Sequence, residues 1–172
     1  MLKKYISLLC FLGFFGVNFA QYVQLSVYSE VSIITAGPGD ELYTTFGHSA
    51  IRIKDPLLKI DLIYNYGMFD FNAPNFYSNF VKGKLIYKLA RYPFKYFTAS
   101  NRKENRWIQE QTLDVTQQER QEFFEFLETN AQPENASYLY DPFFNNCATK
   151  ISEIVTKILG NNIVFKNTHL TE

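Results

Sequence analysis

The stretch Phe143-Phe144-Asn145-Asn146-Cys147-Ala148-Thr149-Lys150 contains the one cysteine that lies outside the first twenty residues. Asn145 or Asn146 can cap the start of a helix here, and Gly160 suits its end. Between them, apolar residues recur at the three- and four-residue steps of a helix: Ala148, Ile151, Ile154, Val155, Ile158 and Leu159. The stretch therefore predicts a helix whose first turn holds Cys147.

A cysteine in the first turn of a helix is chemically distinctive. The unpaired N–H groups and the positive end of the helix dipole stabilise a thiolate and lower the pKa of the thiol. The alternative is structural, because a small half-apolar residue also suits a helix start. The helix alone does not decide between the two, because a catalytic thiol also needs a base from another part of the chain.

The candidate partner is His48, in Thr45-Phe46-Gly47-His48-Ser49-Ala50-Ile51-Arg52-Ile53. Residues 46–53 and 60–66 alternate as strands, and the turn between them, 54–59, opens with Asp-Pro. These segments predict a hairpin. Counting back from the turn places Asn65 opposite His48, or one or two residues away from it.

The rest of the chain predicts a mixture of strands and helices. Thr116 and Glu119 match a capping box, which starts a helix over 117–130. A short helix is expected over 74–81, and an aromatic loop over 133–142. No helix or strand is predicted for Pro93 and the aromatic segment 94–97. Further strands are expected over 23–35, 84–89, 106–115 and 163–165.

The composition indicates an exported domain. Residues 1–20 combine Lys3 and Lys4 with an apolar run that ends at Ala20, which predicts a signal peptide cleaved before Gln21. An uncleaved anchor and a lipoprotein modified at Cys10 are weaker alternatives. The remaining 152 residues, 21–172, suit one domain.

The charge of that domain excludes some partners. Without Lys3 and Lys4, the 17 basic residues become 15 against 17 acidic ones, a net charge of −2. No clustered basic surface suggests nucleic acid. One remaining cysteine cannot form an internal disulfide, which marks it as a reactive or intermolecular thiol. The 12 Tyr and 17 Phe suit either a core or a groove that grips sugar or peptide.

Thiol catalysis needs a nucleophile, an imidazole that takes and returns its proton, and a polar group that orients the imidazole. Cys147 supplies the nucleophile and, through its backbone N–H, one donor for an oxyanion. His48 supplies the base, and Asn65 orients it, with Asp61 on the same strand face in reserve. The structural alternative is substantial, because a lone strand histidine more often has only a structural role.

Other chemistries find less support, and no cofactor is expected. Ser-based catalysis has no G-x-S-x-G elbow. The ligands available for zinc are too scattered along the chain: His48, Cys147 and His169. Paired carboxylates for glycoside cleavage could be drawn from four residues, but their spacing selects no pair: Glu41, Asp61, Asp70 and Asp141.

The order of strand histidine and helix-start cysteine resembles the circularly permuted papain-like thiol hydrolases of the NlpC type, which include the lecithin:retinol acyltransferase-like group. Gly47-His48-Ser49-Ala50 and Asn146-Cys147-Ala148-Thr149 carry this resemblance. It implies an α+β, papain-like fold in which the helix of Cys147 packs on a central antiparallel sheet. The third polar residue of that group would correspond to Asn65 or Asp61.

A closer resemblance, over most of 21–172, is to the bacterial Lnb N-terminal periplasmic domain. It rests on residues 44–52, Tyr64-Asn65-Tyr66-Gly67, Phe69-Asp70-Phe71, Pro133-Glu134-Asn135 and residues 145–149. Members are usually longer and often carry membrane helices after this domain. The resemblance therefore implies a chain truncated at its C-terminus, with membrane association through the missing region.

Together these observations favour an exported cysteine hydrolase or acyltransferase. It would act on an amide or ester of the cell envelope, such as a cell-wall peptide or an acyl group. Two alternatives stay open: a non-catalytic periplasmic module, and a glycan-processing domain related to lacto-N-biosidase, to which the family name alludes. The expected partner is a cell-envelope peptide, lipid or glycan.

Overall fold

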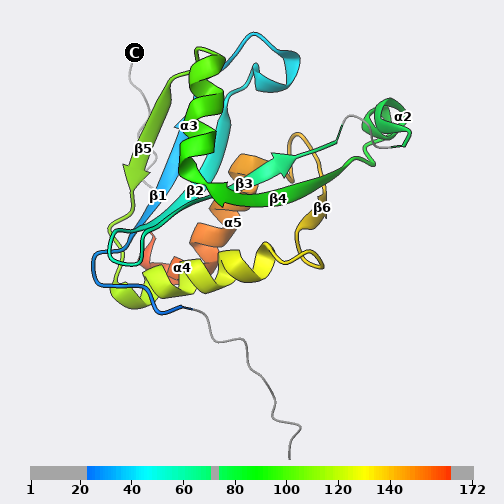
Figure 1. Ribbon diagram of the computed structural model, residues 1–172. Coiled ribbons are helices and arrows are strands. Elements are labelled where there is room, and N and C mark those ends of the chain that lie inside the picture. The colour runs from blue at the N-terminus through cyan, green and yellow to red at the C-terminus, as the bar shows by residue number, and fades with distance from the viewer. Residues whose placement is uncertain (1–22, 71–73, 164–172) are drawn as a thin grey trace, which may run out of the picture.

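Six antiparallel strands form one sheet in the computed structural model, which describes residues 23–70 and 74–163. Their order across the sheet is β5-β1-β2-β3-β4-β6 (Figure 1). The central hairpin therefore has two strands on either side of it. The strands are β1 (Glu30–Ala36), β2 (His48–Asp55), β3 (Ile60–Met68), β4 (Ile86–Pro93), β5 (Ile108–Thr112) and β6 (Ser137–Leu139).

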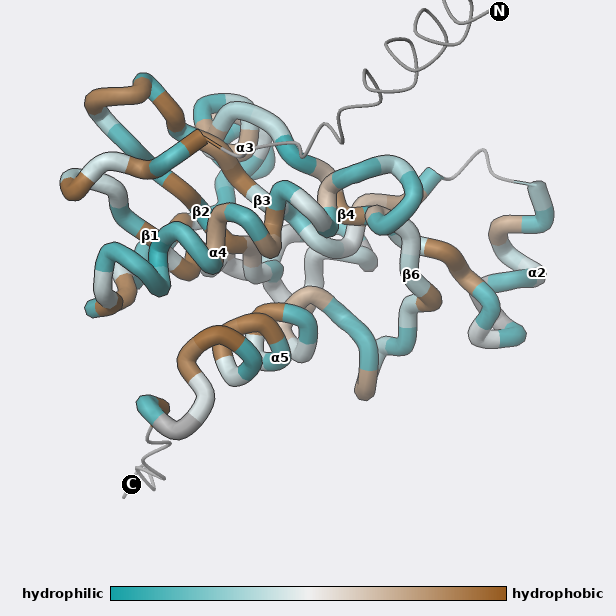
Figure 2. Tube along the Cα trace, turned by 90° about the horizontal axis from the view of Figure 1, so that it is seen from below, coloured by the Kyte–Doolittle hydropathy of each residue, from teal (hydrophilic) through white to brown (hydrophobic). Residues whose placement is uncertain are grey.

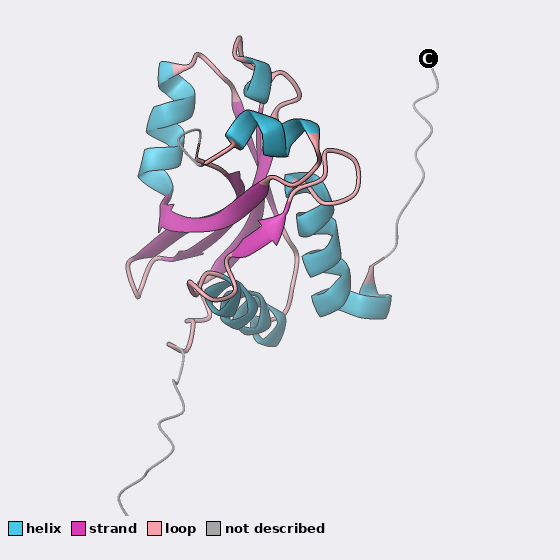
Figure 3. Ribbon diagram, turned by 90° about the vertical axis from the view of Figure 1, so that its right-hand side faces the viewer, coloured by secondary structure: helices cyan, strands magenta, loops and turns pink. Residues whose placement is uncertain are grey.

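Both faces of the sheet are covered by helices. Ile51 and Ile53 of β2 point into the larger core, under α4 (Gln117–Asn130) and α5 (Cys147–Leu159). Ala50 points to the other face, where it packs with Phe97 of α3 (Phe94–Lys103). Figure 3 shows helices on both sides of the strands. In Figure 2, α5 is the more apolar of the two helices beneath the sheet.

The caps of α4 and α5 confirm the two helices that were predicted with local start signals. Thr116 and Glu119 form the reciprocal capping box of α4. Asn146 caps α5 by accepting hydrogen bonds from the N–H groups of Ala148 and Thr149. Gly160 ends α5 with a φ of 50°, a conformation that costs glycine little. Cys147 is therefore the first residue of its helix, as the sequence predicts.

The predicted β2–β3 hairpin is confirmed, and a buried carboxylate holds its turn. Asp55 accepts hydrogen bonds from the N–H groups of Leu57 (3.0 Å) and Leu58 (3.1 Å), and from Ser26 N–H (2.6 Å). These bonds hold the pKa of Asp55 below its usual range, although burial opposes them. The register pairs Ile51 with Tyr64, so Asn65 follows one residue beyond the last pair.

Several predicted boundaries are wrong. Residues 23–29 precede β1 as turn and coil, β4 begins and ends later than 84–89, and β5 is shorter than 106–115. Residues 94–97 open helix α3, and the predicted loop 133–142 contains the short strand β6. The coarse α+β assignment is right, since helices accompany a single antiparallel sheet.

The remaining short elements are the 3₁₀ turns at Leu42–Thr44 and Gly160–Asn162, and helix α2 (Phe76–Val81), which stands off the end of the sheet in Figure 1. The predicted signal peptide, 1–20, lies outside the described residues. So does most of the predicted strand 163–165. Among the residues that are described, no helix combines the length and apolarity needed to cross a membrane.

Candidate functional site

The thiol of Cys147 lies where strands β2 and β3 separate. Their register begins at Ile51 and Tyr64, so the first residues of β2 pair only with β1, as His48 does with Ala36. The start of α5 occupies this place. Cys147 and His48 share a side-chain hydrogen bond, and the thiol also accepts the Ser49 backbone N–H. The Ser49 N–H can bond to the sulfur because β3 does not pair with this part of β2.

His48 reaches the thiol from the other face of the sheet. Its ring lies 6.4 Å from that of Phe97 in α3, centroid to centroid, whereas α5 packs under the opposite face. The two side chains can meet because β2 and β3 no longer pair at this point. If β2 and β3 stayed paired along their whole length, the sheet would keep His48 and Cys147 on opposite faces.

Asn65 contacts the imidazole of His48 through a side-chain hydrogen bond. His48 Nε2 lies 2.5 Å from Asn65 Oδ1, and Asn65 Nδ2 donates to Tyr92 Oη at 2.8 Å. Because Nδ2 is used by Tyr92, Oδ1 is the atom that faces the imidazole. Nε2 is then the protonated nitrogen, which leaves Nδ1 to exchange a proton with the thiol. Tyr92 is a residue that the sequence did not single out.

Gly67 makes room for His48. A Cβ at this position would lie 3.3 Å from His48 Cε1, and Gly67 has a φ of 110°. The conformation therefore favours glycine, and an added Cβ would force the imidazole to shift by a few tenths of an ångström.

We expect Gly67→Ala to destabilise the fold by about 2 to 3 kcal/mol and to displace the imidazole. Gly83→Ala is the control for a positive φ without a contact, because Gly83 has a φ of 64° and no atom within 4 Å of the added methyl group. It should cost about 1 kcal/mol, for the backbone conformation alone. Urea unfolding measures both. Equal losses in the two variants would show that the contact with His48 has no energetic role.

Cys147 and His48 shift each other's pKa in the directions that favour their charged forms. Burial alone would raise the pKa of the Cys147 thiol, but the contact with His48 and the N–H groups of Ser49 and Ala148 outweigh it, so this pKa is lowered. Burial and the Arg106 charge act to lower the pKa of His48, whereas Cys147 and Asn65 raise it above its ordinary value. The two shifts together favour a thiolate beside an imidazolium.

Alkylation of residues 21–172 by iodoacetamide should report the lowered pKa of the thiol. Because the thiolate is the reactive form, the rate should reach half its maximum at a pH below about 8.5, the value of a free thiol. The same chain unfolded in urea is the control and should return to about 8.5. Identical pH profiles for the folded and unfolded chains would contradict the proposed ion pair.

A family model described as the Lnb N-terminal periplasmic domain matches residues 17–170. The chain belongs to this family. Membership confirms the closer of the two resemblances and indicates an exported, periplasmic protein. No curated protein and no solved structure matches the chain, so the permuted papain-like fold is not confirmed.

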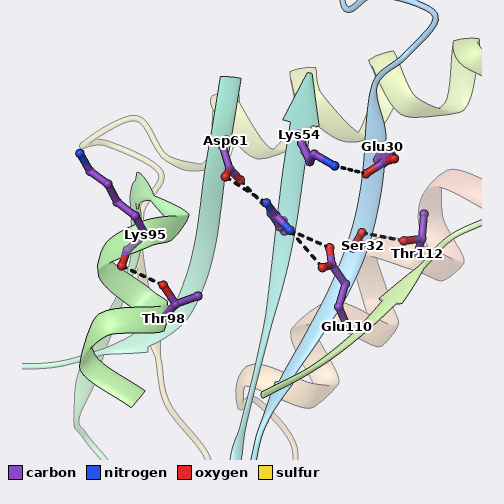
Figure 4. A network of polar contacts seen from close by, with 9 residues as sticks. Glu30, Ser32, Lys54, Asp61, Lys95, Thr98, Glu110 and Thr112 are labelled. Atoms are coloured by element: carbon purple, nitrogen blue, oxygen red, sulfur yellow. Dashed lines mark hydrogen bonds and ion pairs between the residues drawn. The ribbon is translucent and has the colours of Figure 1, made fainter. Parts of the chain in front are cut away.

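Asp61, the reserve residue for orienting the base, is engaged elsewhere in this Lnb N-terminal domain. Its carboxylate forms a two-bond ion pair with Arg52, at 2.7 Å to Nε and 2.9 Å to Nη2. Arg52 also contacts Glu110, and Figure 4 shows Asp61 and Glu110 in this exposed network. Asp61 lies four positions before Asn65 along β3, a distance of about 13 Å. The structure therefore brings Asn65, and not Asp61, to His48.

Asp141, another of the carboxylate candidates, has a local structural role. Asp141 accepts hydrogen bonds from the N–H groups of Phe143 and Phe144, both at 2.8 Å, and so shapes the loop before Cys147. His169 lies outside the described residues. Within 23–70 and 74–163, no group of three or more His, Cys, Asp or Glu side chains could hold a metal ion.

Two cavities lie beside α4 and α5, and Tyr138 and Lys150 line the smaller one. One of about 310 Å³ and an adjoining one of about 620 Å³ lie between α4 and α5. Polar and charged side chains, including Asn130, Asn135 and Lys157, line both of them. Neither His48 nor Cys147 does. The thiol–imidazole pair therefore lies outside the lining of both cavities.

Three exposed phenylalanines lie close in the chain to His48 or to Cys147. Phe46, two residues before His48, is 97% exposed. Phe143 and Phe144, just before Cys147, are 78% and 81% exposed. Chain geometry keeps Phe46 within about 7 Å of His48 and Phe144 within about 11 Å of Cys147, between Cα atoms. We call these three residues the phenylalanine rim.

Proposed function

We propose that this domain is a cysteine-dependent hydrolase or acyltransferase of the cell envelope. The observation that carries the proposal is the position of His48, whose imidazole contacts the Cys147 thiol on one side and Asn65 on the other. This is the relation that thiol catalysis requires between nucleophile, base and orienting group. The proposal extends to the permuted papain-like arrangement that the sequence resembles.

In the proposed reaction, the Cys147 thiolate attacks the carbonyl carbon of an ester or amide. His48 then donates its proton to the departing alcohol or amine. A thioester on Cys147 results. Water completes a hydrolysis, and another alcohol or amine completes an acyl transfer, with His48 taking the proton of the attacking group. Asn65 keeps the imidazole in the tautomer that both steps need.

The phenylalanine rim favours a substrate with an apolar acyl part over a purely polar peptide. The rings of Phe143 and Phe144 lie 6.4 Å apart between centroids, and adjoining exposed apolar residues are typical of binding surfaces. A carboxylate glycosidase has less support, because Asp61 is held by Arg52 and Asp141 by its own loop. A non-catalytic module would not need a lowered thiol pKa, although it would tolerate one.

We expect kcat/KM for p-nitrophenyl esters to rise at least tenfold from acetate to hexanoate. Each buried methylene contributes up to about 0.8 kcal/mol, so four of them could give more than this. Replacing Phe143 and Phe144 together by serine should remove most of the preference. Tyr77→Ser, at a tyrosine that is 75% exposed on α2, is the control and should keep it.

Two results would count against this proposal. Hydrolysis that does not depend on Cys147 would remove the cysteine mechanism. A chain-length preference that is the same in the phenylalanine variant and in Tyr77→Ser would remove the assignment of the rim to the acyl group.

A further inference from the structure

The hydroxyl of Tyr138 is buried and has no hydrogen-bond partner within the described part of the chain. Buried polar atoms are nearly always paired, so each exception calls for an explanation. Tyr138 belongs to β6, where it pairs with Tyr87 of β4. Its position at the end of the sheet is therefore fixed by the backbone, and its hydroxyl is unused in the free protein.

The ring of Tyr138 lies against the side of α5 that carries the thiol. Lys150, one helical turn after Cys147 and on the same helix face, has its Nζ 5.5 Å from the centroid of this ring. The ring also meets Tyr66 edge-on at 6.0 Å, and both Tyr138 and Cys147 pack against the larger core. His48 approaches the sulfur from the face of the sheet that α3 covers, whereas Tyr138 and Cys147 both pack on the face that α4 and α5 cover.

Tyr138 is suited to donate a hydrogen bond at any physiological pH. Burial raises the pKa of its hydroxyl, and the nearby Cys147 raises it further. The group therefore keeps its proton while the thiol loses its own. The backbone N–H of Cys147 is a second available donor, because the first N–H groups of a helix have no acceptor within that helix.

We propose that Tyr138 is a further catalytic residue, whose hydroxyl and the Cys147 N–H together stabilise the oxyanion. The inference rests on the proposed function and assigns a residue to the same site. Catalytic hydrogen bonds often form only once the substrate is bound, which accounts for a hydroxyl that is shielded and unpaired in the free protein.

The proposed step conserves atoms and electrons. The sulfur electron pair forms the S–C bond, and the electron pair of the C=O double bond moves onto oxygen. This oxygen accepts hydrogen bonds from Tyr138 Oη and the Cys147 N–H. When the double bond forms again, the bond to the alcohol or amine breaks, and the leaving group takes the proton from His48. Tyr138 stays protonated throughout.

The test compares Tyr138→Phe with Tyr140→Phe in residues 21–172. Tyr140 is the matched control, since it also lies near the thiol but stacks on Tyr87, with ring centroids 4.0 Å apart. We expect Tyr138→Phe to lower kcat for p-nitrophenyl hexanoate by roughly 10²-fold, the usual cost of one oxyanion donor, with little change in KM. Tyr140→Phe should remain within threefold of wild type.

Alkylation by iodoacetamide separates an oxyanion donor from a structural role. This reaction forms no oxyanion, so Tyr138→Phe should alkylate at the wild-type rate and with the wild-type pH profile. Equal kcat in wild type and Tyr138→Phe would overturn the inference, as would a parallel loss in ester turnover and alkylation. A wild-type protein that forms no thioester on Cys147 would overturn the proposed function itself, and this inference with it.

Discussion

Replacing Cys147 by serine is expected to lower the turnover of p-nitrophenyl hexanoate by at least ~10³-fold, about 4 kcal/mol of transition-state stabilisation. Serine keeps the size and hydrogen bonding of cysteine, but its hydroxyl is barely ionised at neutral pH. The pKa of the thiol is lowered because His48 and two backbone N–H groups stabilise the thiolate more than burial disfavours it. The same contacts are too weak to ionise an alcohol.

Carboxylate variants provide the control for this prediction. Asp61→Asn and Asp70→Asn should retain wild-type turnover of the ester, and a panel of β-linked glycans should distinguish a glycosidase, which would lose activity in one of them. Thermal melts exclude unfolding as the cause of any loss. Full activity of Cys147→Ser on any substrate would eliminate the cysteine mechanism. Loss confined to the Asp variants, on a glycan, would establish the glycan-processing alternative.

Replacing His48 by alanine should lower ester turnover by a similar ~10³-fold, because general acid–base catalysis contributes roughly 10² to 10⁴. The substitution also removes the partner that lowers the pKa of Cys147, so the alkylation profile should move to higher pH. Added imidazole should restore part of the ester turnover. Asn65→Ala should have a smaller effect, since the imidazole would remain but lose its fixed orientation.

The control for the histidine variant is the alkylation rate at high pH, where the thiol ionises without help. This rate should equal that of wild type if the site stays intact. Wild-type turnover in His48→Ala, or an unchanged alkylation profile, would mean that the contact between His48 and Cys147 has no chemical role.

The parts of the fold that sequence predicts best are those with local signals. The capping box at Thr116 and the asparagine before Cys147 mark α4 and α5 because the caps satisfy backbone groups within one helical turn. Helix α3 lacks such a signal. Pro93 precedes α3 and provides no side-chain cap. The buried side chains of α3, Phe97 and Asn101, are buried only because the helix packs on the sheet.

Some residues of the candidate site could likewise be predicted from the sequence, and others could not. His48 and Cys147 stand out by residue type, and Asn65 by its count from the hairpin turn. The sequence left Asp61 as an alternative for orienting the base. Its ion pair with Arg52, on the neighbouring strand, is visible only in the structure. The Ser49 donor and the Tyr138 hydroxyl had no signal in the sequence. One follows from the separation of β2 and β3, and the other from the short strand β6.

The most direct test is to look for a covalent acyl group on Cys147. Residues 21–172 would be mixed with excess p-nitrophenyl hexanoate, quenched in acid within the first turnover, digested and analysed by mass spectrometry. The account predicts a hexanoyl group on the peptide that contains Cys147, absent after hydroxylamine treatment and absent from Cys147→Ala. Ester turnover with no acyl group on that peptide, continuing in Cys147→Ala, would contradict it.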